Sequence, residues 1–460
     1  MRKSLVLTLL LLILAVGSFS YIHASVDRSK DAITIDETVL YGDKAFAEGI
    51  VINLSTQCNN RLFWDTRYTV GEEPQITTAF TFSQTQLEPK RSRPIFKISL
   101  DGMFSSWGAG GSNFDSGAEN FPLPVRDVAA RTKPGENRTE IVYVKDYYEF
   151  YPIAVDFEWP SGFAVNQDTL NLFADFFKIP VDPEHQLAIT VEKSAVGNAY
   201  QINVSPVEDD LYSHATSVTT DSHTFFIFSC YTNDGQLLDT SHIPRGYGIY
   251  RFPRHSESGV HVLTADELQT AFPIDAQRQR AIALKTSKDK SKLLLVTEED
   301  AAYMLTVIDA VTMEELQKLR IMDADIEPDS WHPSLGDLHV YDGFIVAVIG
   351  DNRFALLTLN AAGNYEVQFE ASFDQVEGLE YIFSSQSAMD YSGEKLVVAA
   401  FQHGYFQPRN YCSFYLAVYN NAGLAYAGHY QHSLDKSQIP NYNLMCRPVE
   451  GVPLRVIWPD

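Results

Sequence analysis

The sequence predicts an all-β protein: a β-propeller of about seven four-stranded blades with a few short helices, preceded by one N-terminal hydrophobic helix. The first observation is that short apolar runs of alternating period fill the chain from Ile33 onward, broken by Asn, Asp, Gly and Pro. The second is a repeated order of strand, Asp or Asn, turn and strand in the C-terminal half. Four-stranded repeats of roughly 40–60 residues are typical of propeller blades. The alternative is a β-sandwich plus a smaller propeller-like domain.

The repeats are clearest within 219–431. Three units and one weaker upstream copy cover 287–321, 338–373, 387–431 and 219–239. In the three stronger units a strand ends in Asp309, Asn360 or Asn420. Such side chains bond the backbone two residues further on, so each unit predicts a hairpin at this point. Residues 30–215 contain strands but no clean repeat.

Residues 303–321, "YMLTVIDAVTMEELQKLRI", fit two structures. Thr312 and Glu315 form a capping box, which predicts an amphipathic helix. The parallel stretches "ALLTLNAAGNYEVQF" and "YLAVYNNAGLAYAGH" have no helical period but share the strand–Asx–turn–strand order. We therefore predict a hairpin here. Helices are predicted at 168–179 and 264–272 instead, the second from another capping box.

"LTVIDAVTMEEL" resembles the outer hairpin of YVTN-like and quinoprotein-like blades, and "DYSGEKLVVAA" resembles the inner hairpin of TolB-like blades. The resemblance covers about a third of the chain and implies a propeller of extracytoplasmic type. It identifies no ligand set for a quinone cofactor. In a closed ring, the last strand, 453–458, is expected to pair beside N-terminal strands such as 49–54.

The N-terminus is predicted to direct export. Arg2 and Lys3 precede an apolar stretch, Leu5–Ile22, that is long enough to span a bilayer. Small residues near its end also offer cleavage sites, so 1–25 is either a signal peptide or a signal-anchor helix. Residues 26–32 are expected to form a polar tether. With the basic residues inside, everything after about residue 25 lies outside, membrane-tethered or secreted.

The remaining body, 33–460, is predicted to be one propeller-like domain. The chain has a formal net charge of −24, which excludes nucleic acid and anionic lipid surfaces as general partners. Contact with the membrane is expected through the N-terminal segment only.

Four cysteines are widely spaced and form no CxxC pair, which excludes zinc-ribbon sites. An exported protein can hold two disulfides, and Cys412–Cys446 is the first pair expected because it is local. Buried free thiols are the alternative.

A weak calcium candidate is the acidic stretch that follows the first strong repeat. Its carboxylates alternate along the chain and are Asp323, Asp325, Glu327 and Asp329. An EF-hand loop would need Gly where Pro328 stands, so a solvated connector is the default. Apart from this possible structural calcium, no cofactor is expected.

Aromatic residues supply the candidate binding surface. Trp107 lies in the Gly-rich stretch 106–117, expected to be a loop. Tyr147, Tyr148 and Tyr151 lie in a dense aromatic run, which is expected to be core on one side, with its exposed side as the candidate to line a binding cleft. Rigid aromatic side chains provide contact area for peptide or sugar.

The sequence identifies no catalytic residue, since it contains no GxSxG elbow and no histidine spacing of metal-ligand type. We therefore expect a non-enzymatic binding module, membrane-tethered or secreted, for a protein, a peptide or a glycan. The alternative is an extracytoplasmic polysaccharide hydrolase or lyase that uses a carboxylate pair. A cofactor-binding propeller of the quinoprotein type is the third hypothesis.

Overall fold

The computed structural model divides the chain into two compact units, described separately below. Unit 1 comprises Met1–Lys90, Pro333–His339 and Gly343–Asp460, and unit 2 comprises Arg91–His332 and Val340–Asp342. The residues that the structure describes are 2–29, 33–58, 62–82, 95–100, 106–114, 118–158, 164–165, 167–196, 198–207, 211–232, 236–253, 260–261, 263–324, 338–349, 352–373, 375–379, 382–383, 387–402, 411–435, 446–449, 452 and 454–459.

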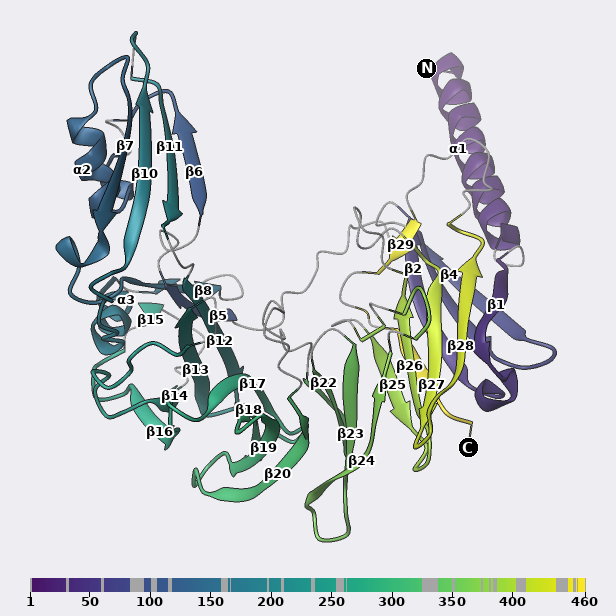
Figure 1. The fold of residues 1–460 in the computed structure, drawn as a ribbon. Helices are drawn as coiled ribbons and strands as arrows, with labels where there is room; N and C mark the ends of the chain where they lie inside the picture. Colours follow the sequence, from purple (N-terminus) through teal and green to yellow (C-terminus); the bar gives the residue numbers. More distant parts are fainter. Residues whose placement is uncertain are drawn as a thin grey trace. The chain divides into compact units, whose positions relative to one another are not determined.

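Unit 1 begins with helix α1 (Arg2–Ser29), drawn in purple in Figure 1. Within it, Val6–Ala24 has a mean hydropathy of 2.1 and no part buried by the rest of the protein. These 19 residues rise about 28 Å as a helix, close to the hydrocarbon thickness of a bilayer. The predicted N-terminal apolar helix is confirmed, and it has the form shared by signal peptides and signal anchors.

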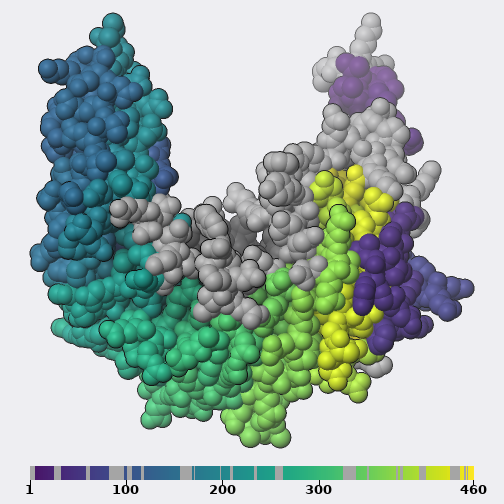
Figure 2. Space-filling model, in the orientation of Figure 1, coloured from purple at the N-terminus to yellow at the C-terminus, as the bar shows by residue number. Residues whose placement is uncertain are grey.

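Two sheets of unit 1 each combine N-terminal and C-terminal strands. One has the order β1-β28-β27-β26-β25, and the other has β29-β2-β3-β4 with β30 beside β2. Their strands are β1 (Ile35–Gly42), β25 (Ala388–Tyr391), β26 (Leu396–Phe401), β27 (Phe414–Asn420), β28 (Gly423–His432), β2 (Val51–Cys58), β3 (Leu62–Thr69), β4 (Gln75–Phe82), β29 (Cys446–Pro448) and β30 (Arg455–Ile457). The space-filling view shows N-terminal residues (purple) directly against C-terminal residues (yellow) (Figure 2).

The predicted closing pair is confirmed. In the antiparallel pair of β2 and β30, Ile52 lies opposite Val456. Strand β1 adds a second closure, since Ile35 pairs with His432 and Gly42 with Tyr426 across β28. The sheet formed by β25 to β28 therefore contains five strands, and its outermost strand is β1, from the N-terminal part of the chain.

A third sheet follows chain order, β21-β22-β23-β24. Its strands are β21 (Leu338–Val340), which crosses the boundary between the units, β22 (Phe344–Ile349), β23 (Arg353–Leu359) and β24 (Tyr365–Ser372). All six residues of β22 are buried, as in a strand covered on both faces.

Unit 2 contains two sheets of the same kind, β12-β13-β14-β16 and β17-β18-β19-β20. Their strands are β12 (Leu211–Thr219), β13 (His223–Thr232), β14 (Gly248–Pro253), β16 (Gln269–Pro273), β17 (Arg280–Thr286), β18 (Lys292–Glu299), β19 (Ala302–Asp309) and β20 (Glu315–Asp323). Sheets whose strands pair in chain order are the unit of a propeller blade. The predicted all-β, propeller-like class is confirmed; the extent of one domain over 33–460 stays a prediction.

The stretch at 303–321 is a hairpin, as predicted, and not a helix. Asp309 Oδ1 accepts hydrogen bonds from the backbone N–H groups of Val311 and Thr312, each at 2.8 Å. The equivalent oxygens of Asn360 and Asn420 accept from residues two positions further on, at 2.9 and 2.8 Å. The Asx turn that defines the repeat is therefore the same in three sheets.

Unit 2 also has a sheet that is not of blade type, with the order β6-β11-β10-β7. Its strands are β6 (Trp107–Gly111), β7 (Asn137–Tyr143), β10 (Gln186–Lys193) and β11 (Tyr200–Pro206). Helix α2 (Leu123–Arg131) packs against β10 and β7 (Figure 1). Two short strand pairs complete the unit: β5 (Ile95–Leu100) with β8 (Ile153–Glu158), and β9 (Ala164–Val165) with β15 (Val260–His261).

Of the two predicted helices, the first is confirmed as α3 (Gln167–Phe176) and the second is wrong. Its capping box does form, because Glu267 Oε2 accepts from the Thr264 backbone N–H at 2.8 Å. The chain then turns only once, and β16 pairs with β14 instead. Sheet pairing has overridden a local helix signal.

Candidate functional site

A groove of about 680 Å³ opens on unit 1 beside the sheet β1-β28-β27-β26-β25. It is lined by Leu40, Tyr41, Gln375, Val376, Glu377, Gly378 and Tyr415. The first two belong to β1, the last belongs to β27, and the other four belong to the segment after β24. Three parts of the chain that are distant in sequence thus build one concave surface.

Strand pairing places the two tyrosines on one face of the sheet. Tyr415 pairs with His429, which pairs with Thr38 of β1, and Tyr41 lies opposite Ala427 two positions along β28. Alternate residues of a strand share a face, so these side chains point the same way. A β-bulge between Val39 and Tyr41 leaves one extra residue, Leu40, at the groove.

One of the lining tyrosines, Tyr415, packs against the imidazole of His429. The rings of Tyr415 and His429 lie 4.8 Å apart between centroids, tilted by 36°. Nε2 of His429 is 3.1 Å from Oε1 of Gln402, which holds the imidazole in place. Burial lowers the pKa of His429, so the ring is neutral at pH 7.

The wall opposite β1 depends on Gly378. Its φ of +98° is a conformation that favours glycine, and a Cβ there would lie 2.8 Å from the hydroxyl of Tyr415. The neighbouring Leu379 is fully buried and anchors this segment. The close approach of backbone to tyrosine fixes one side of the groove.

The rim of the groove exposes apolar and acidic groups together. Leu40 and Tyr41 are 36% and 44% exposed, which is unusual for large apolar side chains side by side on one strand. Glu377 is exposed and is the one charged residue among the seven that line the groove. The arrangement offers two aromatic rings, two aliphatic side chains, one amide and one carboxylate to a ligand.

The opposite face of β1 fastens it to the core. Tyr426 donates a hydrogen bond from its hydroxyl to Glu37 Oε1 at 2.7 Å, and Lys44 Nζ lies 2.5 Å from Glu37 Oε2. Burial raises the pKa of Tyr426 and of its neighbour Tyr430, so both remain protonated donors. The strand that carries the groove is therefore held by a partly buried polar network.

The predicted binding-surface residues lie elsewhere, in unit 2. Trp107 is not in a loop but in β6, where its ring stacks on Phe121 with centroids 6.3 Å apart. The assignment of Tyr151 to a surface is wrong, because it is 2% exposed and its hydroxyl contacts His185 Nδ1 at 3.1 Å. The signal that suggested a cleft was the aromatic side of a buried core.

Tyr147 and Tyr148 are half-buried and attach to helix α2. The hydroxyl of Tyr147 donates to Asp127 Oδ2 at 2.6 Å, and that of Tyr148 accepts from the Leu123 backbone N–H at 3.0 Å. Burial, with the nearby Asp127 carboxylate, raises the pKa of Tyr147 to about 12. A role for these residues or Trp107 in binding stays a prediction.

The calcium candidates are mostly outside the described residues, namely Asp325, Glu327 and Asp329. Asp323 ends β20 and forms an ion pair with Arg320. In the part of the chain that the structure describes, no group of three His, Cys, Asp or Glu side chains could hold a metal ion. The calcium hypothesis stays a prediction.

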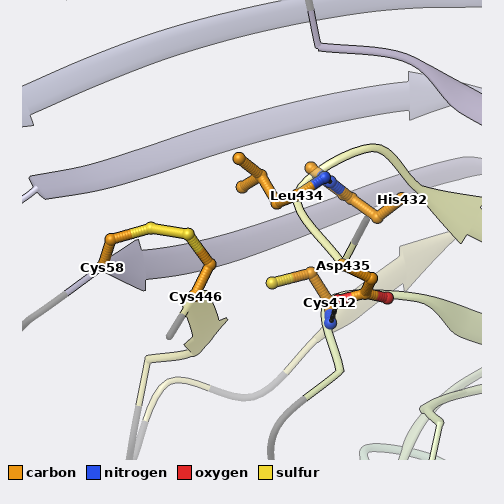
Figure 3. The surroundings of a disulfide bond; sticks show 6 residues. All are labelled: Cys58, Cys412, His432, Leu434, Asp435 and Cys446. Carbon is orange, nitrogen blue, oxygen red and sulfur yellow. Dashed lines mark hydrogen bonds between the residues drawn. A yellow bond between two sulfur atoms is a disulfide. The ribbon is translucent and has the colours of Figure 1, made fainter. Parts of the chain in front are cut away.

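The expected Cys412–Cys446 disulfide is wrong: Cys446 pairs with Cys58 (Figure 3). These two residues lie directly opposite each other in the β2–β29 pair, with Cα atoms 4.3 Å apart. Cys412 is a buried thiol in the same apolar cluster, and its sulfur points toward the disulfide. Its backbone N–H donates to Asp435 Oδ1 at 2.6 Å. Sequence distance misled here, because strand closure brings the chain ends together.

Described carboxylates with a clearly shifted pKa all have it lowered, by turn N–H groups, hydroxyls or ion pairs. They are Glu136, Asp239, Asp289, Glu299 and Asp309. In Asp309, for example, the two turn N–H groups hold the pKa down. A general acid of a glycoside hydrolase needs the opposite shift.

No family model matches this chain, and no curated protein matches it. Among solved structures, it is similar to the β-propeller domain of Cps50 (Swd1) from Myceliophteria thermophila, at 14% identity and a TM-score of 0.23 over 53% of this chain and 69% of that one. It is similar to a 6-phosphogluconolactonase candidate from Bacteroides uniformis, at 11% identity and a TM-score of 0.31 over 82% of this chain and 94% of that one. It is also similar to Hsv2 of Kluyveromyces lactis, at 9% identity and a TM-score of 0.19 over 44% of this chain and 59% of that one. At these low scores the likenesses carry no argument about function.

Proposed function

We propose that this protein is an exported, membrane-tethered module without enzymatic activity, which binds a protein, peptide or glycan in the groove of unit 1. The observation that carries the proposal is the position of β1. It follows the apolar helix α1 after five residues, it contributes Leu40 and Tyr41 to the groove, and it is the outermost strand of its sheet. A module tethered by α1 would hold this binding surface within a short distance of the membrane.

Two features support a binding role. The groove combines the rings of two tyrosines and the aliphatic side chains of Leu40 and Val376 with the polar side chains of Gln375 and Glu377, so it offers both contact area and hydrogen-bonding groups. It is built on a sheet whose closing strand is fastened by the Glu37–Tyr426 hydrogen bond, so the surface is preorganised.

Two experiments test the proposal. The first locates the chain: N-terminal sequencing of the exported protein should return the full helix, whereas a mature start near 18–25 would overturn the tether. The second maps binding with the full-length chain in detergent on peptide and glycan arrays. Tyr41→Ala should abolish binding of any ligand found, whereas Tyr143→Ala, which removes a tyrosine of similar exposure (42%) from unit 2, should not.

If both tyrosine variants bind every ligand like the parent chain, the groove is not the binding site. Release of reducing sugar from a polysaccharide panel by the purified chain would overturn the non-enzymatic role. The arrays therefore test the binding site, and the sugar assay tests the lack of enzymatic activity.

A further inference from the structure

The inference below rests on the proposed function and names the ligand chemistry of the same groove. Among the seven lining residues, the one charge is the carboxylate of Glu377, and no lysine or arginine is present. The chain as a whole has a formal charge of −24. Both the local and the long-range field therefore favour a positively charged occupant.

The aromatic groups of the groove fit the same occupant. Tyr41 and Tyr415 present rings to the groove, and a cation over such a ring is attracted by its negative face. Unit 1 already contains this interaction, since Lys395 Nζ lies 5.2 Å from the ring centre of Phe46 and 5.9 Å from that of Trp458. A cationic side chain from another molecule would repeat it with a carboxylate beside it.

The imidazole that packs against Tyr415 adds no competing charge. His429 is neutral at pH 7 because burial lowers its pKa, and Gln402 already engages its Nε2. The exposed side chain of Leu40 can cover the methylene groups of a lysine or arginine. Apart from Glu377, the polar side chains that line the groove, namely Gln375 and the two tyrosines, carry no charge at pH 7.

We infer that the groove binds a lysine or arginine side chain of a basic peptide segment, with the cation between Glu377 and the two tyrosines. The alkyl part of the side chain lies along Leu40. A neutral oligosaccharide, which would also stack on tyrosine, gains nothing from the carboxylate's charge and is the competing occupant in the test.

The experiment uses the full-length chain in detergent at 150 mM salt, where long-range attraction is largely screened. Three probes are compared by fluorescence anisotropy: labelled hexalysine, the same peptide with every side-chain amine acetylated, and labelled maltohexaose. Hexalysine should bind and the other two should not. Glu377→Gln should weaken hexalysine binding about 3-fold, the size expected of an exposed ion pair.

Glu73→Gln is the matched control. It removes the same charge from an exposed position in the turn between β3 and β4, on another sheet of unit 1, and should leave binding unchanged. Tyr41→Leu keeps apolar bulk but removes the ring, and should weaken hexalysine binding about 2- to 5-fold. These side chains are exposed, so the variants should fold.

Equal losses in Glu377→Gln and Glu73→Gln would mean that only net charge matters, and would overturn the inference. Maltohexaose binding that is lost in Tyr41→Leu, without hexalysine binding that depends on the same ring, would overturn it while leaving the proposed function intact. If no probe and no array ligand depends on Tyr41, the inference and the proposed function fall together.

Discussion

Breaking the Cys58–Cys446 disulfide should destabilise unit 1 strongly. The bond links residues 388 apart in sequence, and both strands that it joins lie in unit 1. The chain-entropy relation for a loop of this length gives about 6 kcal/mol, and measured losses for native disulfides are commonly about 2–5 kcal/mol. We expect reduction to lower the free energy of unfolding by about 3–5 kcal/mol.

The assay is urea unfolding of the chain after refolding with and without TCEP, followed by circular dichroism and tryptophan fluorescence. Trp64 packs in the apolar cluster of the disulfide and reports on this part of unit 1. A Cys58→Ala/Cys446→Ala variant is the control, because TCEP should not change its midpoint. A loss below about 1 kcal/mol on reduction would refute the entropic argument, since it would show that the unfolded chain gains little freedom.

Three further outcomes follow from single contacts. Burial lowers the pKa of His432 to about 4, below its usual 6.5, so the folded state resists protonation of this ring. The free energy of unfolding should therefore fall as the pH drops from 6.5 toward 4, by about 2 kcal/mol at pH 5. The variant His432→Gln should flatten that slope in pH-dependent urea titrations. An unchanged slope would exclude His432 as the cause. Asp309→Ala removes two turn hydrogen bonds and should lower the free energy of unfolding of unit 2 by about 1 kcal/mol, whereas an unchanged thermal midpoint would mean that the turn does not need them. Gly378→Ala should lower the midpoint more than Gly363→Ala: both have positive φ, but only at Gly378 would a Cβ meet the Tyr415 hydroxyl. Equal shifts of the thermal midpoint would show that the backbone at Gly378 or the Tyr415 side chain moves to make room for the methyl group.

The elements that could be predicted from the sequence are those with a repeated local pattern. The hairpin at 303–321 was predicted because two parallel stretches share its Asx turn, and the capping box that favoured a helix was outweighed. At 264–272 there was no parallel stretch, so the same type of box was misread as a helix. Helix α2 was missed, although Val125, Val128 and Ala129 are buried on one side at helical spacing. Comparison between repeats was more reliable than a local cap.

The groove and the disulfide depend on closure between distant strands, which local patterns do not encode. Leu40, Tyr41 and Tyr415 carry no sequence signal that joins them. The disulfide was within reach, however. The predicted pairing of 453–458 with 49–54 already placed the flanking segments of Cys446 and Cys58 close together. Choosing the pair nearest in sequence ignored that consequence.

The same closure imposes an order on folding. Strand β2 pairs with β29 and β30, and β1 pairs with β28. Unit 1 therefore cannot complete two of its sheets until these C-terminal strands have been synthesised. The core cluster of unit 2 comes from residues between Ile98 and Ala310, so this unit can form earlier. During synthesis, β1 and one edge of β2 therefore remain unpaired while unit 2 is made. Truncation before β29 would leave that edge of β2 unpaired in the finished chain, in an exposed and aggregation-prone state.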